Sequence, residues 1–253
     1  MQPEKYLARI GFHQPPRNDV ATLKALHRAH LLSVPFENLD IVLKRNIVLE
    51  ERSLFTKIVE GGRGGFCYEL NALFAWLATR LGFEVRMIAA QVFKKDGTAG
   101  PPFDHMALLV EVEDEQYLAD VSFGDSFLQP LKIFDQGRQV EEGRRVYQLV
   151  RSEAGFTLLS GSSADSDSLK PSFTFSLEPR QLSDFEEMCV YHQTSDLSHF
   201  TRNEICSIAT ETGRITLSGD QVIETIGGVR NVVELTSTED KRQALAKYFR
   251  ITL

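Results

Sequence analysis

Three side chains of this 253-residue chain have the types and the placement that nucleophilic catalysis requires. Cys67 stands at the start of an apolar-periodic segment, His105 opens a strand-like segment, and Asp120 lies near the end of the next one. A thiolate nucleophile needs a base to hold or accept its proton, and that base needs a third group to fix its tautomer. The set therefore predicts catalysis by an activated cysteine.

The segment that carries Cys67 has the period of a helix with a buried face. Its apolar residues recur at spacings of three and four: Leu70, Leu73, Phe74, Leu77 and Leu81. Backbone N–H groups and the macrodipole at a helix N-terminus stabilise negative charge, so we expect the Cys67 thiol to ionise more readily than a free one. We expect Gly64 and Gly65 to turn the chain and leave space above the sulfur. The alternative is that Cys67 is a small buried hydrophobe.

A hairpin brings the other two residues together. The segments HMALLVEVE (105–113) and QYLADVSF (116–123) read as strands joined by a turn at Asp114 and Glu115. Antiparallel pairing places His105 and Asp120 at the same end of this hairpin. Taken singly, each is more often a strand-end or turn residue, and only together with Cys67 do they indicate chemistry.

Composition excludes several other classes of function. With 42% hydrophobic and 25% charged residues the chain is globular, and its net charge of −7 and scattered basic residues argue against nucleic-acid binding. No apolar run approaches the length of a membrane span, and no leader peptide is recognisable. Cys67, Cys189 and Cys206 are too few and too unevenly spaced for a disulfide framework, so we expect a reducing, cytoplasmic location. No oligomeric state is indicated.

The order of elements predicts an α+β protein of up to three packed modules. Helical patterns fill residues 1–62, with Asp19 capping one helix, and strand patterns follow from 83 to 177, including 144–151, 156–159 and 172–177. Residues 161–168 read as a polar loop, and a helix, two strands and a C-terminal helix starting near Ser237 end the chain. His27 and His30 share a helix face without a matching acid or thiolate, so we expect no metal site there.

At this point the chain resembles a known family. The segments RGGFCYELN (63–71), VPFENLD (34–40) and FDHMALLV...YLADVSFGD (103–125) look like the signatures of the arylamine N-acetyltransferases. The resemblance implies a helical module (1–82) carrying the nucleophile, a β-barrel module (83–178) carrying His and Asp, and an α/β lid (179–253). It also implies a catalytic core related to papain and transglutaminases.

The resemblance assigns roles to residues. It implies Cys67 as nucleophile, His105 as its partner and Asp120 as the orienting carboxylate. The positions that match the family near its acceptor pocket are Phe36, Tyr68, Phe123 and the segment Ser198–Phe200, with His199 and Phe200. The candidates for contacts with the coenzyme are Lys94, Lys95, Gly97 and Asp104.

The chain also departs from the family's pattern at two positions. Ser122 stands where glycine is usual, and Asp104 stands where threonine or serine is frequent. A separate expectation concerns Glu37 and Arg63, which we predict to form an ion pair behind the catalytic helix.

The implied reaction is acetyl transfer from acetyl-CoA, a co-substrate and not a permanently bound cofactor, to arylamines, arylhydrazines or N-hydroxyarylamines. It would follow a ping-pong course through an acetyl-cysteine, with no metal. Two alternatives use the same residues differently: a transglutaminase-like cysteine amidase or peptidase, and a non-catalytic binding module of the same fold.

Overall fold

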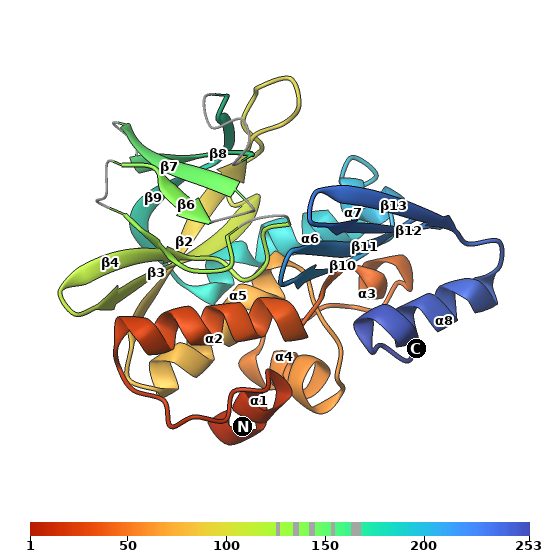
Figure 1. The fold of residues 1–253 in the computed structure, drawn as a ribbon, viewed down its shortest axis with the longest axis horizontal. Coiled ribbons are helices and arrows are strands. Elements are labelled where there is room, and N and C mark those ends of the chain that lie inside the picture. The colour runs from red at the N-terminus through yellow and green to blue at the C-terminus, as the bar shows by residue number, and fades with distance from the viewer. Residues whose placement is uncertain (125–126, 134–136, 142–144, 153–154, 163–167) are drawn as a thin grey trace.

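The computed structural model describes residues 1–124, 127–133, 137–141, 145–152, 155–162 and 168–253. The predicted α+β class is confirmed. N-terminal helices lie along one side of the molecule, a nearly closed sheet of eight strands stands above one end of them, and a second sheet of five strands lies above the other end (Figure 1). In the part of the chain that is described, no helix has the length and apolarity of a membrane span.

The N-terminal helices surround a central one. They are α1 (Pro3–Arg9), α2 (Val20–Ser33), α3 (Leu39–Val42), α4 (Glu51–Phe55) with a following π-helical turn (Thr56–Glu60), and α5 (Cys67–Arg80). As predicted, Asp19 caps α2, where its carboxylate accepts a hydrogen bond from the Thr22 N–H at 2.7 Å. Every residue of α5 from Cys67 to Ala78 is buried, so this helix is the centre of the largest hydrophobic core.

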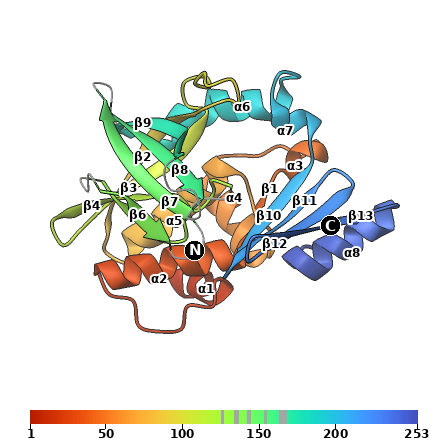
Figure 2. The ribbon, with the colours of Figure 1, turned by 45° about the horizontal axis from the view of Figure 1, so that its top comes forward.

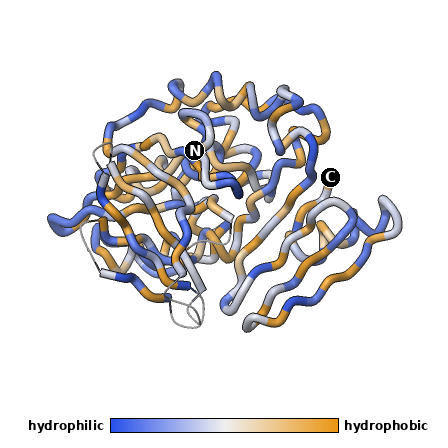
Figure 3. Tube along the Cα trace, turned by 90° about the horizontal axis from the view of Figure 1, so that it is seen from above, coloured by the Kyte–Doolittle hydropathy of each residue, from blue (hydrophilic) through white to orange (hydrophobic). Residues whose placement is uncertain are grey.

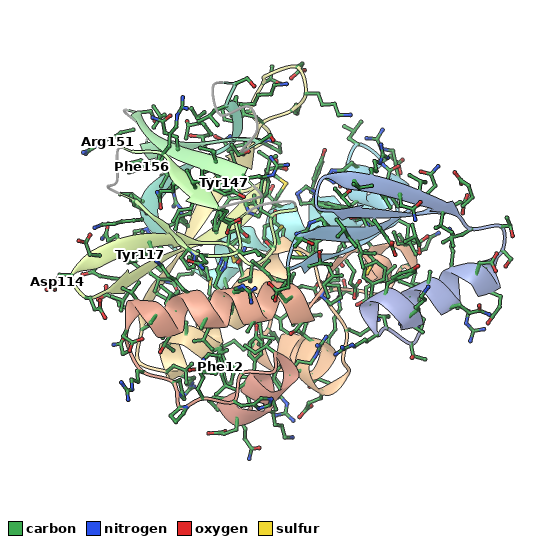
Figure 4. The ribbon with its side chains drawn as sticks, in the orientation of Figure 1. Phe12, Asp114, Tyr117, Tyr147, Arg151 and Phe156 are labelled. Carbon is green, nitrogen blue, oxygen red and sulfur yellow. The ribbon has the colours of Figure 1, made fainter. Side chains whose placement is uncertain are left out.

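The eight-stranded sheet is antiparallel and has the order β5-β4-β3-β2-β9-β8-β7-β6. Its strands are β2 (Glu84–Val92), β3 (His105–Val112), β4 (Glu115–Ala119), β5 (Leu131–Lys132), β6 (Gln139–Glu141), β7 (Arg145–Ser152), β8 (Gly155–Ser162) and β9 (Lys170–Arg180). The two edges are joined through Gln139, whose amide both donates to and accepts from the Lys132 backbone at 2.9 Å. A second core fills the interior and includes Tyr147 and Phe156, labelled on β7 and β8 in Figure 4.

The C-terminal part contains a 3-10 turn (Leu182–Phe185), α6 (Glu186–Thr194), α7 (His199–Arg202), β10 (Ile205–Thr210), β11 (Gly213–Ser218), β12 (Gln221–Ile226), β13 (Val229–Glu234) and α8 (Thr238–Phe249). Figure 2 shows α6 and α7 running from the barrel to the five-stranded sheet. That sheet has the order β1-β10-β11-β12-β13, and its first strand is β1 (Phe36–Glu37), with Phe36 opposite Ser207. The N-terminal segment VPFENLD is therefore tied to the C-terminal sheet.

Most of the predicted elements are confirmed, and the differences have local causes. The short strands β5 and β6 were missed because two or three residues carry no periodic signal. Both β12 and β13 were missed, since only two strands were expected before the C-terminal helix; β13 is an edge strand with all six residues exposed. Polar and apolar residues alternate along much of the five-stranded sheet (Figure 3). The segment Ser198–Phe200, expected as a loop, is instead the capped start of α7. Residue 144 of the predicted strand and residues 163–167 of the predicted polar loop lie outside the described residues.

Candidate active site

Cys67 is the first residue of α5, as the sequence predicted, and its side chain is buried with 3% exposure. The helix start is closed by Glu69, whose carboxylate accepts a hydrogen bond from the Phe66 N–H at 3.1 Å. Since the first N–H groups of a helix have no acceptor within it, backbone N–H donors are available around Cys67.

The glycines before Cys67 have a different role from the one expected. A Cβ on Gly64 would lie 2.0 Å from the Pro35 carbonyl oxygen, and one on Gly65 would lie 2.8 Å from the Glu69 Cβ. Neither glycine lines the cavity next to Cys67. The prediction that they clear space above the sulfur is wrong, because they permit close packing of the chain beneath the helix start.

The predicted ion pair between Glu37 and Arg63 is confirmed and is part of a larger buried cluster. The Arg63 guanidinium donates to Glu37 at 2.9 Å and to Asp40 at 3.0 Å. The Lys57 ammonium contacts both Glu69 carboxylate oxygens, at 2.8 and 3.0 Å, and Asp40 at 2.8 Å. This charge cluster joins the β1 segment to the first turn of the helix that carries Cys67.

His105 and Asp120 meet at one end of the β3–β4 hairpin, as predicted. Leu108 pairs with Ala119, so His105 and Asp120 lie beyond the paired part of the hairpin. His105 Nε2 lies 2.6 Å from Asp120 Oδ2. Asp120 is 1% exposed. Although burial opposes ionisation, the His105 ring and several hydrogen-bond donors hold the pKa of Asp120 below its usual range.

Three residues that the sequence analysis did not assign to the site support Asp120. The Asn71 amide donates to Asp120 Oδ1 at 2.9 Å, and both the N–H and the hydroxyl of Ser122 donate to the same oxygen at 3.0 Å. His27 Nε2 accepts the Asp120 backbone N–H at 3.1 Å. Asn71 follows Cys67 by one helical turn, and this spacing was the one available signal. The contact between Asp120 and His27 spans 93 residues, and no sequence pattern signals it.

A cavity of about 840 Å³ opens in front of Cys67 and His105, between the barrel and the C-terminal segments. Most of the residues predicted to contact substrates line it: Phe36, Phe123, His199, Phe200, Lys94, Lys95 and Asp104. Tyr68 and Gly97 do not. Tyr68 is fully buried beside the cavity, where its hydroxyl donates to the Phe103 carbonyl at 2.7 Å, and its contact with an acceptor stays a prediction. Gly97 lies in an exposed turn of the loop that follows β2.

The electrostatics of Cys67 also differ from the expectation. Burial raises the pKa of the Cys67 thiol well above its usual value, and the nearby carboxylates of Asp120 and Asp104 raise it further. The helix start does not overcome these effects, so the expectation of an intrinsically acidic thiol is wrong. Because His105 Nε2 lies against Asp120, Nδ1 is the ring nitrogen left for another partner.

Comparison with known proteins places this arrangement in a family. A family model described as N-acetyltransferase matches residues 19–253. The arylamine N-acetyltransferase of Mycolicibacterium smegmatis is 33% identical over 98% of this chain and 91% of the relative. The chain belongs to the arylamine N-acetyltransferase family. It is therefore an enzyme, an acyltransferase.

Other members of the family agree in sequence and in structure. Human arylamine N-acetyltransferase 1 is 33% identical over 84% of this chain and 79% of its own length. The solved structure of the M. smegmatis arylamine N-acetyltransferase superimposes with a TM-score of 0.91 at 32% identity, covering 100% of this chain and 93% of that one. The Salmonella typhimurium enzyme gives 0.90 at 29% identity, covering 98% and 90%.

A metal has no evident place in the described structure. Among the residues that the structure describes, no cluster of three or more His, Cys, Asp or Glu side chains could hold an ion. His27 and His30 are both buried, and each has a partner in the core. His27 Nδ1 lies 2.9 Å from the Leu128 carbonyl oxygen, and His30 Nδ1 lies 2.8 Å from the Tyr6 hydroxyl.

Proposed function

We propose that this enzyme transfers an acetyl group from acetyl-CoA to arylamines, arylhydrazines or N-hydroxyarylamines through an acetyl-Cys67 intermediate. The observation that carries the proposal is the buried His105–Asp120 pair, 2.6 Å apart, whose His105 lines the same cavity as Cys67. A buried carboxylate on one ring nitrogen orients the imidazole and stabilises its charged form.

The first half-reaction loads the enzyme. His105 Nδ1 accepts the Cys67 proton, and the thiolate attacks the carbonyl carbon of the acetyl thioester. The tetrahedral intermediate collapses by breaking the bond to the CoA sulfur, which leaves as CoA and takes the proton from the imidazolium. Because burial and the nearby carboxylates raise the pKa of the Cys67 thiol, the proton stays on sulfur until the His105 ring accepts it. The proposed oxyanion donor is the Cys67 backbone N–H.

The second half-reaction releases the product. After CoA leaves, the amine enters the same cavity and attacks the acetyl carbon, and neutral His105 accepts its proton as the bond to sulfur breaks. Because CoA leaves the acetyl-enzyme before the amine enters, the course is ping-pong. The aromatic rings of Phe36, Phe123 and Phe200 line the cavity, and an aniline ring can stack against them.

The donor would approach along the basic part of the cavity wall. Lys94, Lys95 and Arg202 line it and could contact the phosphates of CoA.

We keep the division into modules 1–82, 83–178 and 179–253 and the relation to papain-like cores as part of this proposal. Its support is a nucleophile at a helix start that packs against a sheet carrying His and Asp. The cytoplasmic location stays a prediction.

Replacement of the nucleophile tests the function. Cys67→Ala and Cys67→Ser should abolish acetyl transfer from acetyl-CoA to aniline, while Cys189→Ala and Cys206→Ala, which remove the other two buried thiols, should retain most of it. Mass spectrometry after mixing with acetyl-CoA should show one acetyl group on Cys67. Turnover by Cys67→Ala would refute the mechanism. Failure to acetylate Cys67 in the unmodified enzyme would favour an amidase or a binding module.

A further inference from the structure

Two titratable side chains that the proposed mechanism does not use lie side by side at the cavity wall. Asp104 lies directly before His105 in the chain, and His192 lies on α6. His192 Nε2 is 3.5 Å from Asp104 Oδ1, and both residues line the cavity with Cys67. The side chain of His192 is 4% exposed and that of Asp104 is 18% exposed.

The position of Asp104 is built into the fold. A Cβ on Gly100 would lie 2.3 Å from Asp104 Oδ2, so a side chain at that position would displace this carboxylate. The same oxygen accepts the Val92 N–H at 3.4 Å. The other oxygen, Oδ1, is thereby directed towards His192.

His192 is held in place through its other ring nitrogen. His192 Nδ1 lies 3.1 Å from the hydroxyl of Ser198, the residue that caps α7, and the ring packs edge-on against Phe200 at 5.1 Å. Nε2 is buried and has no hydrogen-bond partner among the described residues. A buried polar atom without a partner is costly, so a ligand group that reaches it would gain free energy.

The pair also lies close to the reacting sulfur. The charge of Asp104 acts on the Cys67 thiol and raises its pKa, after burial and Asp120. Phe200, which His192 contacts, lines the same cavity as Cys67. A small aromatic acceptor that places its amine at Cys67 therefore comes within reach of the pair.

We propose that Asp104 and His192 form a polar acceptor subsite that selects arylamines carrying an uncharged hydrogen-bond-donating substituent and discriminates against those carrying a carboxylate. A carboxylate at Asp104 only accepts hydrogen bonds, so it matches the N–H groups of a carboxamide or a hydrazide. A second carboxylate placed directly beside Asp104 is repelled by it, even though Lys94, Lys95 and Arg202 line the same cavity. This inference rests on the proposed function, because it assigns the specificity of the acceptor half-reaction.

The test compares two acceptors of nearly the same shape, 4-aminobenzamide and 4-aminobenzoate. In the unmodified enzyme, kcat/KM should be at least about tenfold higher for the amide, because the amide makes a hydrogen bond to an ionised group and the acid meets repulsion. Asp104→Asn should reduce the ratio of the two values by about tenfold, and His192→Phe, which keeps a ring but removes Nε2, should also reduce it. Asp96→Asn changes the same charge in a turn outside the cavity and should leave the ratio unchanged.

The ratio separates specificity from general damage, because a folding defect or a slower first half-reaction affects both acceptors equally. An unmodified enzyme that prefers 4-aminobenzoate, or an Asp104→Asn ratio equal to that of the unmodified enzyme, would overturn the subsite. Calorimetric binding of both compounds to Cys67→Ala measures the same discrimination without turnover. A loss of aniline acetylation with preserved discrimination in binding would therefore count against the proposed function alone.

Discussion

Lys57 should be one of the most sensitive positions outside the cavity. Its ammonium makes three contacts of 2.8 to 3.0 Å with Glu69 and Asp40, and the side chains of Lys57 and Glu69 are 15% and 1% exposed. Lys57→Met leaves Glu69 buried without its cation, which costs about 3–5 kcal/mol when one partner of a buried pair is removed. Because Glu69 lies in the first turn of α5, the loss should also disturb the position of Cys67.

The free energy of unfolding can be measured by urea denaturation. Trp76, the single tryptophan, is buried in α5 and reports on the helix by fluorescence. Burial already raises the pKa of Glu69, and removing Lys57 should raise it further. A carboxyl with a raised pKa in the folded state binds more protons there than in the unfolded state, so stability falls as pH rises. The loss in free energy of unfolding caused by Lys57→Met should therefore be larger at pH 8 than at pH 5.

The matched control removes both charges. Lys57→Met combined with Glu69→Gln leaves no unpaired anion at Glu69, so the double variant should recover much of the stability lost in the single one, and the double-mutant cycle gives the coupling between them. A loss below about 1 kcal/mol in Lys57→Met, a value typical of exposed ion pairs, would refute the argument. A double variant no more stable than the single one would do the same.

Two further outcomes follow from the groups around Asp120. Asn71→Ala should lower kcat for acetyl transfer by roughly tenfold to a hundredfold, because a hydrogen bond to an ionised carboxylate contributes about 1.5–3 kcal/mol; an unchanged kcat would exclude a role for Asn71 in positioning Asp120. Burial lowers the pKa of His27 to about 4, so between pH 6.5 and that value only the unfolded state binds its proton, and stability declines as pH falls through this window. The free energy of unfolding, measured by urea denaturation from pH 7 to 4, should therefore depend less on pH in His27→Gln, by up to about 1.4 kcal/mol per pH unit. Equal slopes in the two proteins would contradict the buried neutral ring.

Local patterns were sufficient for the elements that carry the three central residues. The spacing of three and four from Leu70 to Leu81 predicted α5, and the paired strand patterns predicted that His105 and Asp120 meet. These predictions succeeded because helix and hairpin geometry depend on residues close together in the chain. The motif resemblance predicted the family that the comparisons then established.

The sequence by itself determined the types of the proposed reacting groups and the elements on which they stand. Only the tertiary structure decided their surroundings: that Phe36 reaches the cavity through the β1–β10 pairing, that Tyr68 lies beside it, and that His192 faces Asp104. It also decided the sign of the Cys67 pKa shift, because desolvation depends on how much of the chain packs around the sulfur. Contacts between segments distant in the chain leave no periodic signal in either segment, so they become visible only when the chain is folded.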